Sequence, residues 1–198
     1  EWIDLYQVHW PSREVPFAET YTALATLKQQ GKIREIGLSN FGALDLEAWM
    51  SSGSAVSDQL GYNLFFRAIE HDIVPACTRY DLGILAYMPL LQGILTGRWN
   101  SLEDIPVSRR RTRHFASDRE GTRHKEGGCE AMTFEALRRL RALAKRIGRP
   151  AADVALAWAM AQPRVSSVIV GGRKPSQVKR NTAALTLKLE PEQLAELD

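Results

Sequence analysis

The feature of this sequence that most constrains its fold is a repeated alternation between short apolar runs and longer amphipathic runs. Short apolar runs bounded by Gly or Pro are typical of buried strands. We expect five strands, at residues 3–10, 36–40, 56–62, 84–88 and 167–170. Because no strand has a clear polar face, the alternation favours a parallel sheet that is covered by helices.

The intervening runs have the three- and four-residue spacing of amphipathic helices. The first is expected to have Pro16 as its first residue and to end before Gly31, which are typical start and stop residues of a helix. Further helices are expected at 44–50, 69–80, 133–147, 151–162 and 175–185, and another begins at 190–198. Thr133 is a plausible N-cap. The run at 151–162 is apolar nearly all round, which predicts a buried helix.

Residues 90–132 have no sustained period, and loops of this length are usually functional or disordered. An open doubly wound sheet usually carries an early G-x-G-x-x-G turn, which this sequence lacks. A (β/α) barrel needs eight strands. We therefore expect an α/β fold, a partial (β/α)8 TIM barrel containing parallel strands four to eight with their helices. Residues 1–198 are then the C-terminal part of one domain, and three strand–helix units are expected on the N-terminal side.

Composition excludes several classes of function. Cys77 and Cys129 lie far apart, in no metal-ligand or redox spacing, so we expect free thiols in a reducing, cytoplasmic compartment and no metal. No apolar run approaches about 20 residues, so no membrane span is expected. The net charge of +3 is too small to indicate a nucleic-acid partner. The sequence does not define an oligomeric state.

A basic loop lies inside the long aperiodic segment. Residues 109–114 contain four arginines, and Phe115 is the only adjacent aromatic residue. Binding to nucleic acid would need more aromatic partners or a defined element to enter a groove. Two interpretations stay open: the loop covers an anionic cofactor or the substrate, or it is a solvated loop.

Polar residues follow several of the predicted strands. His9 ends the first, Ser39 and Asn40 the second, Gln59 lies near the end of the third, and Tyr87 ends the fourth. In a parallel barrel the carboxyl ends of the strands face the active site. Histidine can donate a hydrogen bond or move a proton near neutral pH. Taken alone, however, such a histidine more often bonds to backbone, and Ser-Asn is often only a turn.

The sequence resembles the aldo-keto reductases over nearly its whole length. The resemblance rests on residues 4–10, 31–41, 59–63, 87–97 and 170–173, the last followed by Gln177 and Asn181. Each segment is weak evidence alone, but all occur in the family order, at or just after a strand end. The resemblance implies a (β/α)8 barrel that binds NADP(H) in an extended form and transfers hydride to a small carbonyl substrate, or from the corresponding alcohol.

The resemblance also implies roles for particular residues. His9 would hydrogen-bond and orient the substrate carbonyl. The expected cofactor residues are Ser39, Asn40 and Gln59 on the nicotinamide carboxamide, Tyr87 stacked under its ring, Leu90, Gln92 and Leu95 in a strap over the pyrophosphate, Gly171, Gly172 and Arg173 at the phosphates, and Gln177 and Asn181 near the adenine. A glycine-containing loop lets backbone N–H groups approach phosphate closely.

One part of the family pattern is not found. The proton-donating tyrosine of the family, with its lysine and aspartate, belongs to the first half of the barrel. Tyr6, Tyr21, Tyr62 and Tyr80 do not occur in that motif context. Three hypotheses follow: an NADP(H)-dependent carbonyl reductase, a non-catalytic nucleotide-binding module like the channel-associated relatives, or an inactive truncated product.

Overall fold

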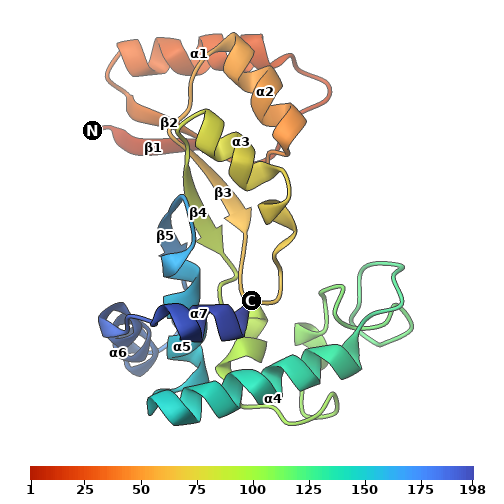
Figure 1. Ribbon diagram of the computed structural model, residues 1–198. Coiled ribbons are helices and arrows are strands. Elements are labelled where there is room, and N and C mark those ends of the chain that lie inside the picture. Colours follow the sequence, from red (N-terminus) through yellow and green to blue (C-terminus); the bar gives the residue numbers. More distant parts are fainter. The chain divides into compact units, whose positions relative to one another are not determined.

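The computed structural model describes residues 1–198 and contains one sheet of five parallel strands. The strands are β1 (Ile3–Val8), β2 (Ile33–Ser39), β3 (Ser57–Gly61), β4 (Gly83–Tyr87) and β5 (Val165–Ile169). Each strand pairs with the next strand of the sequence, in the order β1-β2-β3-β4-β5 (Figure 1). This order confirms the predicted α/β fold with a parallel sheet.

Helices occupy most of the chain between the strands. The α-helices are α1 (Phe17–Gln29), α2 (Ala43–Ser52), α3 (Ile73–Arg79), α4 (Glu130–Ile147), α5 (Ala151–Ala161), α6 (Pro175–Ala183) and α7 (Pro191–Leu197). The 3-10 helices are η1 (Ala68–Glu70), η2 (Leu91–Thr96), η3 (Val107–Arg109) and η4 (Ala184–Thr186). None of the helices is both long enough and apolar enough to cross a membrane.

The chain divides into two compact units. The first comprises residues 1–62, 66–87 and 162–169, and it holds the whole sheet with α1, α2 and α3. The second comprises residues 63–65, 88–161 and 170–198, and it holds α4 to α7 together with the long aperiodic segment.

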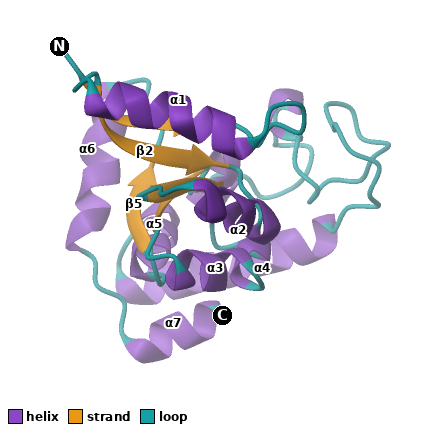
Figure 2. Ribbon diagram, turned by 90° about the horizontal axis from the view of Figure 1, so that it is seen from above, coloured by secondary structure: helices purple, strands orange, loops and turns teal.

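The core of the first unit lies where its helices meet the sheet. Helix α1 runs beside β2, and α2 lies next to α3 (Figures 1 and 2). Phe41 and the fully buried Trp49 pack edge to face, with ring centroids 5.7 Å apart, and the ring of Phe17 lies 5.4 Å from that of Phe41. Such aromatic pairs add about 0.5–1.5 kcal/mol each to the burial of apolar area.

The second unit is built around α5. Six consecutive residues of this helix, Val154–Ala159, are buried, which confirms the buried helix predicted from its apolar sequence. Helix α5 contacts α4, α6, η2 and η4. A helix that packs against several partners needs apolar residues on all its faces.

The prediction that β1 is a buried strand was wrong. Ile3 is 49% exposed and Tyr6 is 41% exposed. Strand β1 lies at the edge of the sheet and has one strand neighbour, so its apolar composition is not matched by burial. The strand also ends at Val8, before His9 and Trp10.

Three predicted helices have different boundaries. The helix expected at 175–185 is α6, which ends at Ala183 and is followed by η4. Residues 69–80 do not form one helix but η1 followed by α3. Glu70, the last residue of η1, accepts hydrogen bonds from Arg67 and from Tyr62. Helix α4 begins at Glu130, so Thr133 is not its N-cap; the Thr133 hydroxyl donates to the Cys129 carbonyl at 2.9 Å.

The aperiodic segment 90–132 is packed rather than disordered. It contains η2 and η3, and Ile105 and Phe115 are fully buried within the second unit. The absence of a sequence period reflects short turns, which have no repeating face to bury.

A buried carboxyl group on β3 is an unusual feature of the first unit. Asp58 is fully buried, and the backbone N–H of Phe41 lies near its carboxyl group but makes no well-formed hydrogen bond with either oxygen. Burial raises the pKa of Asp58 from 3.8 to about 8. The backbone amide of Phe41 opposes this shift and the charge of Asp45 adds to it. Asp58 is therefore largely protonated in the folded protein at neutral pH, because the charged form would lose its hydration.

This carboxyl group predicts a pH-dependent stability. Between pH 4 and 8 an unfolded Asp58 releases its proton while the folded one keeps it. The free energy of unfolding therefore falls as pH rises through this range, by up to about 1.4 kcal/mol per pH unit. Asp58→Asn removes this contribution. Urea unfolding should show the variant gaining stability relative to the native protein, by up to about 4 kcal/mol, between pH 5 and 8.

The matched control is Asp72→Asn, which changes an exposed carboxyl in the same unit. Its stability relative to the native protein, measured at each pH, is the reference for the Asp58→Asn curve. A difference between Asp58→Asn and the native protein that does not change with pH would show that Asp58 ionises normally in the folded protein.

Candidate functional site

The side chain of Asn40 connects the carboxyl ends of three strands in the first unit. Asn40 directly follows β2 and has a left-handed backbone, with φ of 61°. Its Nδ2 group donates to the His9 carbonyl and to Ser39 Oγ, both at 3.0 Å. Its Oδ1 accepts a hydrogen bond from the Tyr87 hydroxyl at 2.9 Å. One amide therefore joins the ends of β1, β2 and β4.

Gln59 on β3 is part of the same arrangement. The backbone carbonyl of Gln59 accepts hydrogen bonds from the Ser39 hydroxyl and from the backbone N–H of Asn40, both at 3.0 Å. The sheet register also pairs Ser39 with Gln59. The structure thus brings together four of the residues expected to contact the nicotinamide: Ser39, Asn40, Gln59 and Tyr87.

The Tyr87 ring is held close to the backbone of β3. A Cβ atom added at Gly61 would lie 3.2 Å from Cζ of Tyr87, so the absence of a side chain at Gly61 gives the ring its place. Burial raises the pKa of the Tyr87 hydroxyl, and the nearby Asp58 adds to the effect. The hydroxyl therefore stays protonated at neutral pH and can donate to Asn40.

The backbone carbonyl of His9 is hydrogen-bonded within the protein, whereas its imidazole is not. Its backbone carbonyl is fixed by the Asn40 amide. Its imidazole is exposed, makes no hydrogen bond within the protein, and has its centroid 5.9 Å from that of the Trp10 ring. The ring is therefore free to bond to a ligand, while the backbone beneath it is held in place.

The polar groups of this edge fit a carboxamide. Such a group has two N–H donors and one carbonyl acceptor. The half-buried Gln59 amide makes no hydrogen bond within the protein, so it offers both a donor and an acceptor. Ser39 Oγ accepts from Asn40 and donates to Gln59, which leaves it one lone pair.

The expected strap residues lie in the second unit, in the turns that follow β4. Met88, Leu91 and Gln92 have positive φ angles of 54°, 44° and 55°. Such backbone conformations cost on the order of 1 kcal/mol or more each for residues other than glycine, and they concentrate at functional sites. Leu95 is fully buried, so its side chain cannot reach a ligand. Leu90 and Gln92 are half-buried.

The Leu90 carbonyl closes these turns by accepting from the N–H groups of Gly93 at 2.8 Å and Leu95 at 3.3 Å. Gly93 itself has a positive φ of 98°. The segment is therefore a set of tight, internally bonded turns, in which backbone groups rather than side chains are the natural ligands for an anion.

The second expected phosphate element, also in the second unit, precedes α6. Gln177 Oε1 accepts from the backbone N–H groups of Arg173 at 2.7 Å and Lys174 at 3.1 Å. Asn181 Nδ2 donates to the Gly171 carbonyl at 3.3 Å. Gln177 and Asn181, expected near an adenine, are thus bonded to the turn itself in this structure.

Donors remain at this turn for an anionic ligand. The backbone N–H groups of Gly171 and Gly172 donate to no protein acceptor. The guanidinium of the exposed Arg173 has no ion-pair partner. Backbone N–H groups and a free guanidinium are suitable partners for a phosphate.

The basic loop is tied to the second unit at several points. Arg110 donates to the Ile105 carbonyl at 2.9 Å, and Arg113 pairs with Glu126 at 3.3 Å. Arg109 and Arg111 have no ion-pair partner. The loop is therefore fixed by the bond from Arg110 to the Ile105 carbonyl, while Arg109 and Arg111 have free guanidinium groups. This arrangement is consistent both with a loop that covers an anionic cofactor or the substrate and with a solvated loop.

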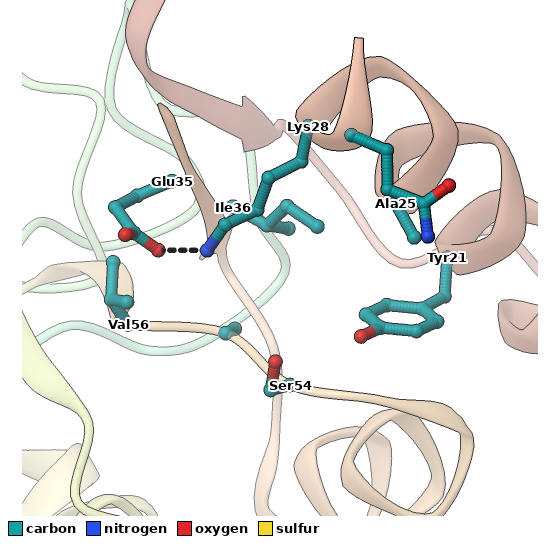
Figure 3. Close-up of a pocket in the computed structure, with 9 residues that line it drawn as sticks. Tyr21, Ala25, Lys28, Glu35, Ile36, Ser54 and Val56 are labelled. Atoms are coloured by element: carbon teal, nitrogen blue, oxygen red, sulfur yellow. Dashed lines mark hydrogen bonds and ion pairs between the residues drawn. The ribbon is translucent and has the colours of Figure 1, made fainter. Parts of the chain in front are cut away.

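A surface pocket of about 300 Å³ lies between α1, β2 and the segment that precedes β3, away from the carboxyl ends of the strands (Figure 3). It is lined by Tyr21, Ala25, Lys28, Gln29, Glu35, Ile36, Ser54, Ala55 and Val56. Lys28 and Glu35 form an ion pair of 2.6 Å in its wall. Ligands of parallel α/β sheets bind at the carboxyl ends of the strands, so this pocket is not the candidate site.

Sequence reasoning missed several residues of this arrangement. Gly61 and Asn63 enter the sequence analysis only as members of the 59–63 segment, and His114 only as the last residue of the 109–114 loop. Asn63 has a weak signal, because it is a polar residue soon after a strand. No side-chain cluster that could hold a metal ion is present.

Comparison with known proteins gives a consistent result. The chain is 31% identical over 192 residues to an NADH-specific methylglyoxal reductase of Escherichia coli, a match that covers 96% of the chain and 56% of that protein. It is 32% identical to a putative voltage-gated potassium channel subunit beta of Schizosaccharomyces pombe, with 100% and 58% covered. The chain thus spans a little over half the length of these curated relatives.

A solved structure agrees in both fold and sequence. The glycerol dehydrogenase of Gluconobacter oxydans matches with a TM-score of 0.84 and 30% identity, over 100% of this chain and 58% of that one. Such reductases are (β/α)8 barrels, so a five-stranded parallel sheet over this share of them is consistent with a partial barrel. The aldo/keto reductase family model matches residues 1–198. The chain belongs to the aldo/keto reductase family.

Proposed function

We propose that the protein containing this chain is an NADP(H)-dependent oxidoreductase that reduces aldehydes or ketones to alcohols. The chain supplies the histidine that orients the substrate and most of the cofactor site. The observation that carries the proposal is the hydrogen-bonded edge around Asn40, which leaves the Gln59 amide and the His9 imidazole available.

The nicotinamide end of the cofactor is assigned to the first unit. Gln59 and Ser39 bond to the carboxamide, and this fixes which face of the ring meets the substrate. Tyr87 packs against the ring, and Asn40 keeps both partners in position through its bonds to Ser39 and Tyr87. When bound, the cofactor supplies the hydride.

His9 acts on the substrate carbonyl. Its exposed imidazole donates a hydrogen bond to the carbonyl oxygen and directs the carbon toward the nicotinamide. The proton that completes reduction to the alcohol comes from a tyrosine that this chain does not place in the site. The chain therefore provides orientation and cofactor binding rather than the whole reaction.

The phosphate end is assigned to the second unit. The turns after β4 contact the pyrophosphate through the backbone N–H groups of Leu90 and Gln92, whereas Leu95 is fully buried and its N–H donates to the Leu90 carbonyl. Gly171, Gly172 and Arg173 bind the phosphate carried by the ribose 2′ oxygen, and Gln177 and Asn181 support that turn. One relative is an NADH-specific methylglyoxal reductase, so the cofactor preference varies among the relatives. The proposed preference for NADP(H) rests on the exposed guanidinium of Arg173, which has no ion-pair partner within the protein.

A non-catalytic nucleotide-binding module is the second candidate. It is favoured by the similarity to a putative voltage-gated potassium channel subunit beta. The two candidates share the cofactor site and differ in turnover. An inactive truncated product is the third, and it would bind no cofactor.

The first prediction concerns cofactor choice. Arg173→Ala removes the guanidinium that pairs with the 2′-phosphate, and leaves the backbone turn intact because Gln177 bonds only to backbone N–H groups. Fluorescence titration should show NADPH binding weakened by roughly 1.5–3 kcal/mol, with little change for NADH. The control is Lys179→Ala, which removes an exposed cation from α6. Equal loss of both cofactors would contradict the assignment of Arg173.

The second prediction concerns His9. His9→Ala removes the imidazole and keeps the backbone carbonyl that Asn40 holds. Steady-state assays with a reactive aldehyde should show kcat/KM reduced by about a hundredfold or more, because general acid–base and orienting groups contribute on this scale. The dissociation constant of the cofactor should stay nearly constant.

His71→Ala, which removes an exposed histidine of the same unit, is the control and should leave both quantities unchanged. Loss of cofactor binding in His9→Ala would instead make the His9 side chain structural. Cofactor binding by the native protein without any turnover would favour the non-catalytic module.

A further inference from the structure

The turn directly after β4 has a backbone conformation that its own sequence does not favour. Met88, Leu91 and Gln92 have positive φ angles, although none of them is glycine. The turn begins at the Met88 carbonyl, which accepts from the N–H of Leu91 at 2.9 Å. Residues of these types adopt left-handed conformations only where neighbouring structure holds them there.

A buried amide outside this segment holds its first carbonyl. Asn63 is fully buried and belongs to the second unit, as Met88 does. Its Nδ2 donates to the Met88 carbonyl at 3.0 Å, so this oxygen accepts two hydrogen bonds. Its Oδ1 accepts from the backbone N–H of Phe65 at 3.0 Å. The amide is therefore oriented by one bond and restrains Met88 by the other.

The segment that carries Asn63 is itself anchored. The Phe65 carbonyl receives a hydrogen bond from Nε2 of His114 at 2.9 Å, and the two rings lie 6.4 Å apart. His114 is buried, and its Nδ1 lies 3.1 Å from the Thr112 hydroxyl. Residues 63–65 are thus hydrogen-bonded at one end to Met88, in the turn after β4, and at the other end to His114, in the basic loop at 109–114. We call these three residues the 63–65 brace.

We propose that Asn63 is a positioning residue for cofactor binding, because its amide holds the Met88 carbonyl and so presets the left-handed turn whose backbone N–H groups receive the pyrophosphate. This inference rests on the proposed function. Asn63 is fully buried, so it acts through the turn and not by contact with the ligand. Removing the bond lets Met88 leave its left-handed conformation, and only the fraction of molecules with the correct turn then binds.

The test uses the full-length protein that contains this chain. Asn63→Asp keeps the acceptor for Phe65 and removes the donor to Met88. Asn63→Ser is a second variant that avoids a buried charge, since its hydroxyl can accept from Phe65 but is too short to reach Met88. Thr133→Val is the matched control, because it removes another buried side-chain hydrogen bond of the same unit.

Dissociation constants are measured for NADPH, NADH and adenosine 2′-monophosphate, well below the unfolding temperature of each variant. The last ligand carries the adenine and the 2′-phosphate but no pyrophosphate. If the correct turn falls to a tenth of the population, both Asn63 variants bind NADPH about tenfold more weakly. They should bind adenosine 2′-monophosphate as the native protein does, and Thr133→Val should match the native protein for all ligands.

Two outcomes would contradict the inference in different ways. Equal NADPH affinity of the native protein and both Asn63 variants, or equal weakening of NADPH and adenosine 2′-monophosphate, would overturn the role of Asn63 alone. A native protein that binds neither NADPH nor NADH would overturn the proposed function and this inference with it.

Discussion

The candidate site depends on a single side-chain amide. Asn40 bonds to the His9 carbonyl, to Ser39 and to Tyr87, and so links residues as distant in the sequence as His9 and Tyr87. Asparagine is suited to this position because it tolerates a left-handed backbone better than most residues and offers donors and an acceptor on one short group. No other side chain bonds both to the residue that follows β1 and to the last residue of β4.

Each of the two units contains an asparagine side chain that fixes a backbone carbonyl by a hydrogen bond. In the first, the Asn40 amide fixes the carbonyl of His9; in the second, the Asn63 amide fixes the carbonyl of Met88. In each case a loop residue has a positive φ, and an amide supplies a hydrogen bond that local sequence cannot. The fixed groups are backbone carbonyls, so the side chain of His9 remains available for a ligand.

The sequence predicted those parts of the structure that depend on pattern. The apolar runs located all five strands, and the polar residues that follow them located Ser39, Asn40, Gln59 and Tyr87 at one edge, where the structure joins Asn40 to Ser39 and Tyr87. The apolar α5 was correctly expected to be buried. These features follow from burial and alternation, which the order of residues records directly.

Other features depend on tertiary context. The exposure of β1 reflects its place at the sheet edge, which its apolar residues do not encode. Asp58 sits in an apolar run and gave no sign of being a buried, protonated carboxyl. In the 63–65 brace, Asn63 bonds to the Met88 carbonyl and the Phe65 carbonyl accepts from His114, across 25 and 49 positions of the sequence. Periodicity in a sequence does not indicate bonds of this kind. Contacts of this kind become visible only in the folded chain.

The most direct test of the account is a crystal structure of the full-length protein with a bound nicotinamide cofactor. The account predicts that the carboxamide lies within hydrogen-bond distance of the Gln59 amide and Ser39 Oγ, that the nicotinamide ring packs against Tyr87, and that Asn40 keeps its bonds to His9 and Tyr87. A cofactor bound with its nicotinamide away from Gln59 and Tyr87 would contradict the central claim that this sheet edge is the nicotinamide site.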